Sequence, residues 1–207
     1  MFIAEKIGMK QNKYFVAITG GIGSGKTTVS KYIRLCGYEV FSADSITREM
    51  YEEAHFIERI GEFCPKCIRE NRVDRKCLAD FVFSDPNKLK QLNSFTHPEI
   101  KQRLFFRMNR ANGSIVFAEV PLLFECGWEN EFDDVIVVLR SESTRVAAVM
   151  QRDGASQNSV QQRINNQINY ENFTEIGHTI LYNDGDLCSL YTKLDRLLYD
   201  YSLRITK

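Results

Sequence analysis

A glycine-rich segment near the N-terminus constrains this chain more than any other feature. It runs from Gly20 to Thr27 and reads Gly-Gly-Ile-Gly-Ser-Gly-Lys-Thr. An apolar β-type run at 14–19 precedes it, and apolar side chains recur at helical spacing over 29–36. A phosphate-binding loop occurs in this order of strand, loop and helix. We therefore predict that the chain binds a nucleoside triphosphate.

Each part of this loop has a predicted task. The glycines let backbone N–H groups point inward, and the start of the following helix adds a partial positive charge. We expect Lys26 to reach the β- and γ-phosphates and the Thr27 hydroxyl to bind Mg²⁺. The weaker alternative is a glycine-rich turn that only connects a strand to a helix. The predicted ATP-binding residues of the loop are Gly20, Gly21, Ile22, Gly23, Ser24, Gly25, Lys26, Thr27 and Thr28.

The overall composition limits the classes of partner. The chain has 27 Lys and Arg residues and 27 Asp and Glu residues, so its bulk charge does not favour a nucleic acid. No apolar run approaches the length of a membrane span. Glu5 and Lys6 interrupt the place where a signal core would lie. We expect a cytoplasmic protein with small-molecule substrates, and its oligomeric state stays open.

The order of the apolar runs predicts the fold class. Strands are expected at 14–19, 38–41, 114–120, 134–139 and 179–183, with helical patterns between them. This alternation predicts an α/β protein with a parallel sheet and right-handed crossovers. A helical stretch is expected from 45 towards 60. Another is expected over 61–110, broken by Pro65, Pro86 and Pro98.

Several classes of phosphate-loop protein fit less well than a small-molecule kinase. GTP-binding switches usually carry an Asn-Lys-x-Asp motif, but Asn87-Lys88 is followed here by Leu89-Lys90. Transporter ATPases and motors normally need longer chains and further signature elements. A short chain with an insertion after its second strand and a polar segment near its C-terminus is typical of a small-molecule kinase.

Further motifs narrow the class. They are Ala43-Asp44-x-x-x-Arg48, Val73-Asp74-Arg75-x-x-Leu78, Leu92-Asn93-x-x-x-His97-Pro98-x-Ile100, Val120-Pro121-Leu122-Leu123-Phe124-Glu125, Gln151-Arg152-Asp153-Gly154, Arg163-Ile164-x-x-Gln167 and Asn183-x-Gly185. In their order and spacing, over roughly residues 14–200, these motifs resemble the dephospho-CoA kinase family. The Pro-Leu-Leu-Phe-Glu and His-Pro motifs are more specific than the phosphate loop.

The resemblance implies transfer of the ATP γ-phosphoryl group to the ribose 3′-hydroxyl of dephospho-CoA. It implies a three-layer α/β/α kinase core around a parallel sheet, with a helical substrate-binding insertion and a small helical lid. Met9 lies just ahead of the first strand, so residues 1–8 are a dispensable tail or follow a start codon placed too early. The expected parts are a tail at 1–13, a nucleotide-binding core at 14–60, 111–151 and 179–207, an insertion at 61–110 that binds the CoA substrate, and a lid at 152–178.

Asp44 is the predicted catalytic carboxylate. It follows the second strand, at the edge of an open α/β sheet where ligands bind. Phosphoryl transfer needs an aligned acceptor hydroxyl more than covalent help, and a carboxylate supplies that alignment. The alternative is an Asp that only caps the next helix, and the two roles are compatible.

Arginines are the predicted charge partners of the phosphates. Arg152 is expected to neutralise charge on the transferred group, and Arg163 lies on one helical face with Gln167. Arg48 and Arg75 are expected to meet phosphates of the acceptor, because guanidinium groups suit phosphate oxygens. Solvated surface positions or surface ion pairs are the alternatives.

Five other residues complete the expected site. His97 is expected to contact substrate or to support the structure, and a catalytic imidazole is the alternative. Leu122 belongs to a motif that packs beside the acceptor. Glu119 ends its strand as an acid near Mg²⁺ would, and Glu125 is a weaker candidate. Asn183 follows the last strand, where adenine is expected.

The six cysteines show no disulfide-scaffold spacing, and we expect reduced thiols. Cys64 and Cys67 have the spacing of half a zinc site or of a redox pair. A zinc site needs a second pair, and only Cys77 lies nearby, so incidental thiols are the favoured interpretation. The cysteines are Cys36, Cys64, Cys67, Cys77, Cys126 and Cys188.

The chain also departs from the family pattern at several positions. Ser42 replaces a frequent Asp, Ala148 a frequent Arg and Phe173 a frequent Lys, and Gly177-His178 replaces a frequent Ala-Asp. The rival interpretations are another small-molecule kinase, such as a nucleoside monophosphate kinase, and a nucleotide-dependent switch protein.

Overall fold

A computed structural model describes residues 13–173 and 178–205, so the expected tail lies almost wholly outside the described residues. The chain divides into a first unit, Met1–Phe41 with Arg107–Lys207, and a second unit, Ser42–Phe106. Each unit is described by itself.

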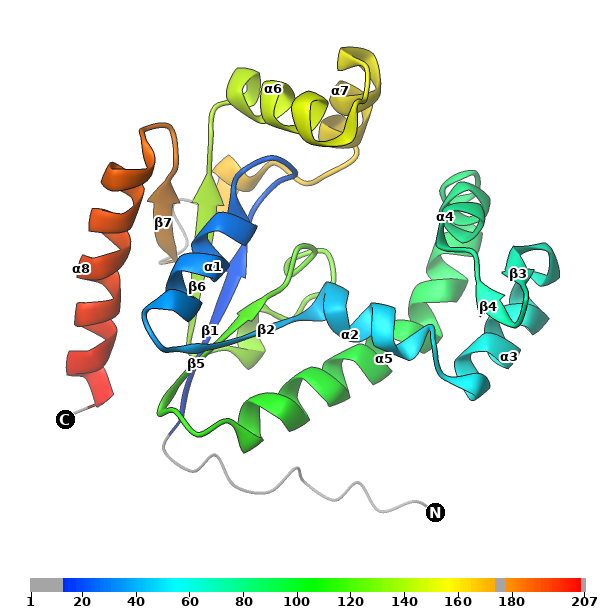
Figure 1. Ribbon diagram of the computed structural model, residues 1–207, viewed down its shortest axis with the longest axis horizontal. Coiled ribbons are helices and arrows are strands. Elements are labelled where there is room, and N and C mark those ends of the chain that lie inside the picture. The colour runs from blue at the N-terminus through cyan, green and yellow to red at the C-terminus, as the bar shows by residue number, and fades with distance from the viewer. Residues whose placement is uncertain (1–12, 174–177, 206–207) are drawn as a thin grey trace. The chain divides into compact units, whose positions relative to one another are not determined.

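A five-stranded sheet forms the centre of the first unit (Figure 1). Its strand order is β2-β5-β1-β6-β7, and β1 pairs in parallel with both β5 and β6. β7 extends the sheet in parallel with β6. The predicted parallel α/β sheet is therefore confirmed. The strands are β1 Tyr14–Thr19, β2 Glu39–Ser42, β5 Ile115–Glu119, β6 Asp134–Leu139 and β7 Thr179–Tyr182.

Helices α1 and α8 pack on one face of this sheet, and Figure 1 shows α8 lying along β7. Val16 and Ile18 of β1 join this core, while Phe15 and Ala17 point to the opposite face and are buried as well. Burial on both faces explains the continuous apolar runs of the central strands. The helical elements of this unit are α1 Lys26–Leu35, α6 Glu142–Asp153, α7 Gln157–Asn165, α8 Leu187–Ile205 and the 3₁₀ turns η2 Glu129–Glu131 and η3 Tyr170–Phe173.

The second unit is helical with a small hairpin. Glu70 and Asn71 connect the hairpin strands with φ angles of 49° and 58°, as a two-residue hairpin turn requires. The buried core of this unit includes Ile60, Leu78 and Val82. Its elements are α2 Ala43–Met50, α3 Ala54–Phe63, the 3₁₀ turn η1 Pro65–Cys67, β3 Ile68–Arg69, β4 Arg72–Val73, α4 Arg75–Phe83 and α5 Pro86–Arg110, whose last turn belongs to the first unit.

Three expectations for this region were wrong in detail. The helix expected from 45 towards 60 is interrupted at 51–53, and the hairpin lies inside the segment expected to be helical. Pro98 does not break α5. Leu92 before it and Ile100 after it are both buried, so packing on either side compensates the backbone hydrogen bond that proline cannot make. None of the helices in the described part of the chain is long and apolar enough to cross a membrane.

The cysteine prediction was also wrong in part, because Cys67 and Cys77 form a disulfide. The fold brings the end of η1 to the first turn of α4, a proximity that the sequence spacing does not reveal. Of the remaining thiols, Cys36 and Cys188 are exposed, Cys126 is half-buried and Cys64 is buried.

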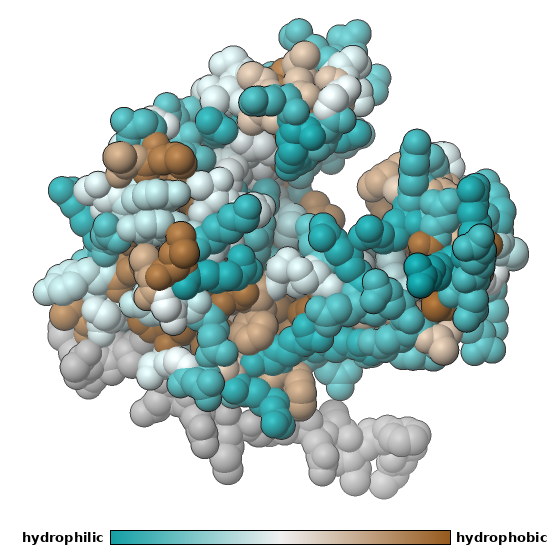
Figure 2. Space-filling model, in the orientation of Figure 1, coloured by the Kyte–Doolittle hydropathy of each residue, from teal (hydrophilic) through white to brown (hydrophobic). Residues whose placement is uncertain are grey.

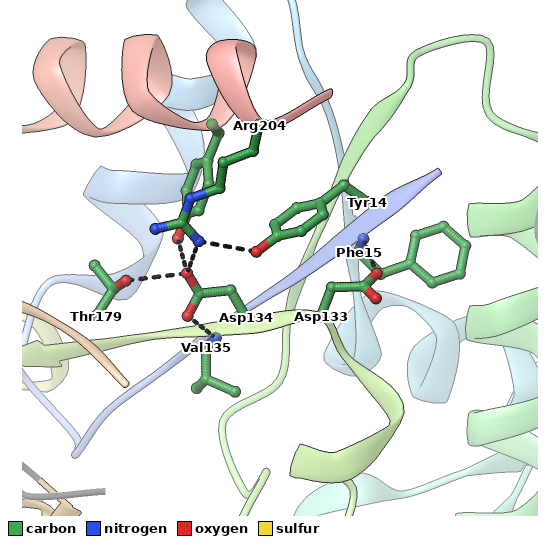
Figure 3. Close-up of polar contacts among 8 residues, drawn as sticks. Tyr14, Phe15, Asp133, Asp134, Val135, Thr179 and Arg204 are labelled. Atoms are coloured by element: carbon green, nitrogen blue, oxygen red, sulfur yellow. Dashed lines mark hydrogen bonds and ion pairs between the residues drawn. The ribbon is translucent and has the colours of Figure 1, made fainter. Parts of the chain in front are cut away.

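A carboxylate at the start of β6 ties several elements of the first unit together (Figure 3). Asp134 Oδ2 accepts hydrogen bonds from Thr179 Oγ1 at 3.1 Å and from the Tyr201 hydroxyl at 3.0 Å. Arg204 donates to the same oxygen at 3.3 Å and to the Tyr14 hydroxyl at 2.9 Å. Because the Asp134 side chain is only 10% exposed, this network anchors β1, β7 and α8 to β6.

We predict that Asp134→Asn lowers the free energy of unfolding by about 1–3 kcal/mol, because three donors then share one neutral oxygen in a nearly buried place. Urea unfolding followed by circular dichroism measures the change. Asp195→Asn is the matched control, since Asp195 also accepts a tyrosine hydroxyl hydrogen bond, from Tyr32 at 2.8 Å, but in an exposed place. The control should change stability by less than about 0.5 kcal/mol, and equal effects of the two variants would contradict the assignment.

Candidate active site

The phosphate loop is held in a shape that only glycine permits at two positions. Gly25 caps α1 with φ 98°, and Gly20 has φ 142°. A Cβ atom on Gly25 would collide with the Asn183 side chain, and one on Gly20 with the carbonyl oxygen of Val138. Residues at the ends of β6 and β7 therefore lie in close contact with the loop. Glycine has no side chain, so it allows this close approach.

The Lys26 ammonium group and the Thr27 hydroxyl each have hydrogen-bond partners within the protein. Lys26 Nζ donates to the carbonyl oxygens of Gly20 at 2.6 Å and Gly21 at 3.0 Å. The Thr27 hydroxyl donates to Glu119 Oε1 at 3.1 Å. Glu119 is 9% exposed at the end of β5, so the loop and its neighbouring strand jointly present a hydroxyl and a carboxylate.

Side chains from distant segments support the loop backbone. Asn183 Nδ2 donates to the Ser24 carbonyl at 2.8 Å. Gln167 Oε1 accepts the Ile22 N–H at 2.7 Å, and Arg145 Nε donates to the Ile22 carbonyl at 2.9 Å. Arg145 lies on α6, and Gln167 follows the end of α7. These two helices pack together through an apolar cluster, and Ile22 of the loop packs against it. The cluster consists of Val146, Val149, Val160 and Ile164. Figure 1 shows α6 and α7 beyond the sheet edge where the loop lies.

A pocket of about 660 Å³ opens beside the loop within the first unit. Arg140 and Arg145 line it together with two acids, Glu142 and Asp184. Tyr170 closes one wall with its hydroxyl donating to the Pro121 carbonyl at 2.8 Å, and burial raises the pKa of Tyr170, so the phenol stays neutral. The lining residues include Gly21, Ser24, Val138, Arg140, Arg145, Gln167, Tyr170, Tyr182 and Asp184.

Sequence reasoning missed Arg140, Arg145 and Tyr170. The family pattern often has an arginine at position 148, where this chain has Ala148. Arg145 lies three residues earlier on α6, hence on the same helix face, and its guanidinium lies where a Cβ on Gly21 would be. The spacing along α6 was the signal that would have found it.

The two arginines predicted for the lid share one partner. Arg152 Nε donates to Asp153 at 2.7 Å, and Arg163 Nη1 donates to it at 3.1 Å. Hydrogen bonding from Arg152, together with the positive charges of both arginines, lowers the pKa of Asp153. The pair links the end of α6 to α7, and both guanidinium groups stay largely exposed. Their contact with a nucleotide stays a prediction.

Asp44 is an exposed residue in the first turn of α2, two residues after β2 ends. The helix cap is Ser42, whose side chain accepts the Ser45 N–H at 3.3 Å. The alternative that Asp44 itself caps this helix was therefore wrong, and its carboxylate is not used as a cap.

Two of the predicted acceptor residues meet in the second unit. Arg48 and Arg75 line a pocket of about 490 Å³. Arg72, which sequence reasoning did not select, adds a third guanidinium, and Tyr51 and Asn71 add polar groups. Three arginines facing one pocket form a site suited to phosphate oxygens.

The remaining predicted residues are placed as follows. His97 is half-buried in α5, and burial lowers its pKa, so the imidazole is neutral near pH 7. Leu122 is 44% exposed after β5. The His178 ring lies 5.3 Å from that of Phe124. Gly177 and the side chain of Phe173 lie outside the described residues.

The residues at the loop fit a magnesium ion bound through a nucleotide. Among the described residues no group of three or more His, Cys, Asp or Glu side chains is arranged to hold a metal by itself. Mg²⁺ in triphosphate sites usually takes one or two protein oxygens together with phosphates and water. The adjacent Thr27 hydroxyl and Glu119 carboxylate are hard oxygen donors of this kind.

Comparison with known proteins gives the same class as the geometry. A family model described as dephospho-CoA kinase matches residues 14–189. The chain belongs to the dephospho-CoA kinase family. A dephospho-CoA kinase of Thermus thermophilus is 36% identical over 183 residues, 88% of this chain and 89% of the relative. That of Wolinella succinogenes is 30% identical over 92% of this chain and 96% of the relative.

Solved structures agree with the family assignment. The crystal structure of a Thermus thermophilus protein, 35% identical, covers 91% of this chain and 97% of its own with a TM-score of 0.82. Dephospho-CoA kinase from Campylobacter jejuni, 27% identical, covers 92% and 98% with a TM-score of 0.69. Shikimate kinase from Acinetobacter baumannii, 14% identical, shares the fold over 92% and 96% at a TM-score of 0.51. The chain is an ATP-dependent kinase with the P-loop kinase fold.

We predict that Gly25→Ala weakens ATP binding at least about tenfold, because a Cβ there displaces Asn183 and shifts the loop that it supports. Titration calorimetry with ATP measures the change. Gly37→Ala is the matched control: it has a similar φ of 89°, but its Cβ would meet nothing within 4 Å. That control should lower stability by about 1–2 kcal/mol while ATP affinity is retained. Unchanged ATP affinity in Gly25→Ala would contradict the assignment.

Proposed function

We propose that this chain transfers the γ-phosphoryl group of ATP to the ribose 3′-hydroxyl of dephospho-CoA, giving CoA. The observation that supports the proposal is a pair of arginine-lined pockets, one in each unit. The phosphate loop and its arginine-lined pocket belong to the first unit, and the pocket of Arg48, Arg72 and Arg75 belongs to the second. A kinase whose donor and acceptor both carry phosphates needs two such sites.

The donor site is proposed to act mainly through charge. Lys26 would exchange its two carbonyl contacts for the β- and γ-phosphates, since a phosphate oxygen is the stronger acceptor. Arg145 and Arg140 would neutralise further phosphate charge in the pocket beside the loop. Arg152 is proposed to stabilise the transferred group, after giving up part of its bond with Asp153.

The acceptor hydroxyl is proposed to be oriented by Asp44. Its carboxylate lies exposed in the first turn of α2, and such a group suits a hydroxyl that must be aligned for in-line attack. Thr27 and Glu119 would hold Mg²⁺, which when bound neutralises charge on the β- and γ-phosphates. His97, Leu122 and Arg163 remain proposed substrate contacts, and Asn183 supports the loop beside the ATP it is proposed to contact.

The second-unit pocket is proposed to take the diphosphate of dephospho-CoA. Arg48, Arg72 and Arg75 supply fork-shaped donors there, and Asn71 adds an amide at the hairpin tip. We also propose a cytoplasmic setting and small-molecule substrates, because the zero formal charge gives no support for a nucleic-acid partner.

An assay of ATP consumption with dephospho-CoA, with AMP and with no acceptor tests the proposal. We expect turnover with dephospho-CoA, at least about a hundredfold above the rate without acceptor. Equal turnover without acceptor would contradict the proposed reaction and favour a nucleotide switch. Turnover with AMP alone would favour a nucleoside monophosphate kinase.

The same assay tests Asp44. Asp44→Asn should lower kcat by about 10²–10³ and leave ATP affinity within about twofold. The substitution removes the group proposed to orient the acceptor hydroxyl and leaves the ATP-binding residues unchanged. Asp200→Asn, at an exposed position of α8, is the control and should retain kcat. Weakened ATP binding at normal kcat in Asp44→Asn would contradict the assigned role.

A further inference from the structure

Three sulfur atoms meet in the second unit, outside both proposed substrate pockets. Cys64 follows the end of α3, Cys67 ends η1 and Cys77 lies in the first turn of α4. Cys67 is bonded to Cys77, and the Cys64 Sγ lies 3.0 Å from the Cys67 Sγ. The proposed phosphoryl transfer uses none of these residues.

The three sulfurs differ in their access to solvent. Cys64 and Cys67 are 2% and 0% exposed, whereas Cys77 is half-buried and lines a surface pocket of about 790 Å³. On the face drawn in Figure 2, hydrophilic side chains cover most of the region that Figure 1 labels α3, β3 and β4, with small apolar patches between them. A small molecule that reaches this cluster therefore meets Cys77 first.

Positive charge surrounds the pocket of Cys77. Two of its lysines hold their ammonium groups over the Phe81 ring, Lys66 at 5.0 Å and Lys88 at 4.3 Å from the ring centre. Asp74, one of two acids there, is already bound to the Cys77 N–H at 3.0 Å and to Arg69 at 3.2 Å. The charged residues that line the pocket are Lys66, Arg69, Lys76, Lys88, Asp74 and Asp80.

The position of Cys77 in α4 also favours a reactive sulfur. Cys77 is the third residue of this nine-residue helix, directly inside the Asp74 cap. The partial positive charge of a helix start and nearby ammonium groups both stabilise a thiolate, the form that attacks disulfides. Charge and access thus coincide at one of the three cysteines.

We propose that Cys77 is an exchange site for an anionic low-molecular-weight disulfide, with Cys67 as the resolving thiol. In the reduced protein the Cys77 thiolate attacks one sulfur of the small disulfide, forms a mixed disulfide and releases one small thiolate. The Cys67 thiolate then attacks the Cys77 sulfur and releases the second small thiolate. Two protein thiols are oxidised and one small disulfide is reduced to two thiols, which leaves the Cys67–Cys77 bond that the structure contains.

The order of the two steps follows from burial. Cys67 is fully buried, so an external disulfide does not reach it, but it lies in bonding contact with Cys77. Cys64 touches Cys67 and does not line the pocket, so it is not the first target. Cys64 is however close enough to act in place of Cys67, and a trapping variant must therefore lack both.

The test uses the full-length protein, reduced and then mixed with glutathione disulfide or with the neutral 2-hydroxyethyl disulfide. Peptide mapping by mass spectrometry locates the products. Wild-type protein should form the Cys67–Cys77 bond, and C64S/C67S should accumulate glutathione on Cys77. With glutathione disulfide, Cys77 should react about tenfold faster than the exposed Cys36 and Cys188. Reaction of Cys77 no faster than these two cysteines, or a Cys64–Cys67 bond in wild type, would overturn the proposal.

The charge of the pocket has its own control. K66Q/K88Q should slow the reaction with glutathione disulfide several-fold and leave the rate with the neutral disulfide unchanged. Added salt should lower only the first of these rates in wild type. C77S, in the otherwise wild-type chain, should form no Cys67 adduct, and this result does not depend on the folding of C64S/C67S. Equal slowing of both reagents, or an adduct on Cys67 in C77S, would contradict the assigned recognition or order.

Discussion

The structure depends on the central place of β1 in the parallel sheet. This strand pairs with β5 and β6 and is buried on both faces, so the loop that follows it has little freedom. The same pairing brings Glu119 and Val138 to the loop from the neighbouring strand ends, and β7 brings Asn183. The shape of the glycine loop is thus fixed from three sides, as a phosphate-binding loop requires.

Where side chains repeat at a regular period, the sequence predicted the structure well. The strand expected at 134–139 has the same bounds as β6. Residues 135–139 are buried on both faces of the sheet, so a continuous apolar run marks this strand in the sequence. The phosphate loop was equally predictable, since its chemistry depends on residues close together in the chain. Thr27 and Glu119, each expected near Mg²⁺, form a hydrogen bond that the sequence did not predict.

What the sequence did not reveal depends on contacts between distant residues. The hairpin turn at Glu70 and Asn71 uses positive φ angles at residues other than glycine, and no Gly or Pro marked it. The family pattern often has an arginine at position 148, and this chain has Arg145 one turn earlier on α6. The two positions lie on the same side of the helix. The Cys67–Cys77 bond arises from the approach of η1 to α4, which spacing alone does not predict.

We propose that the two units hold different substrates, and steady-state kinetics of R72Q/R75Q test this proposal. Both residues line the second-unit pocket, and neither lines the pocket beside the phosphate loop. We expect a rise of at least about tenfold in the KM for dephospho-CoA, with the KM for ATP within about twofold of wild type. An equal rise in both KM values, or a rise for ATP alone, would contradict it.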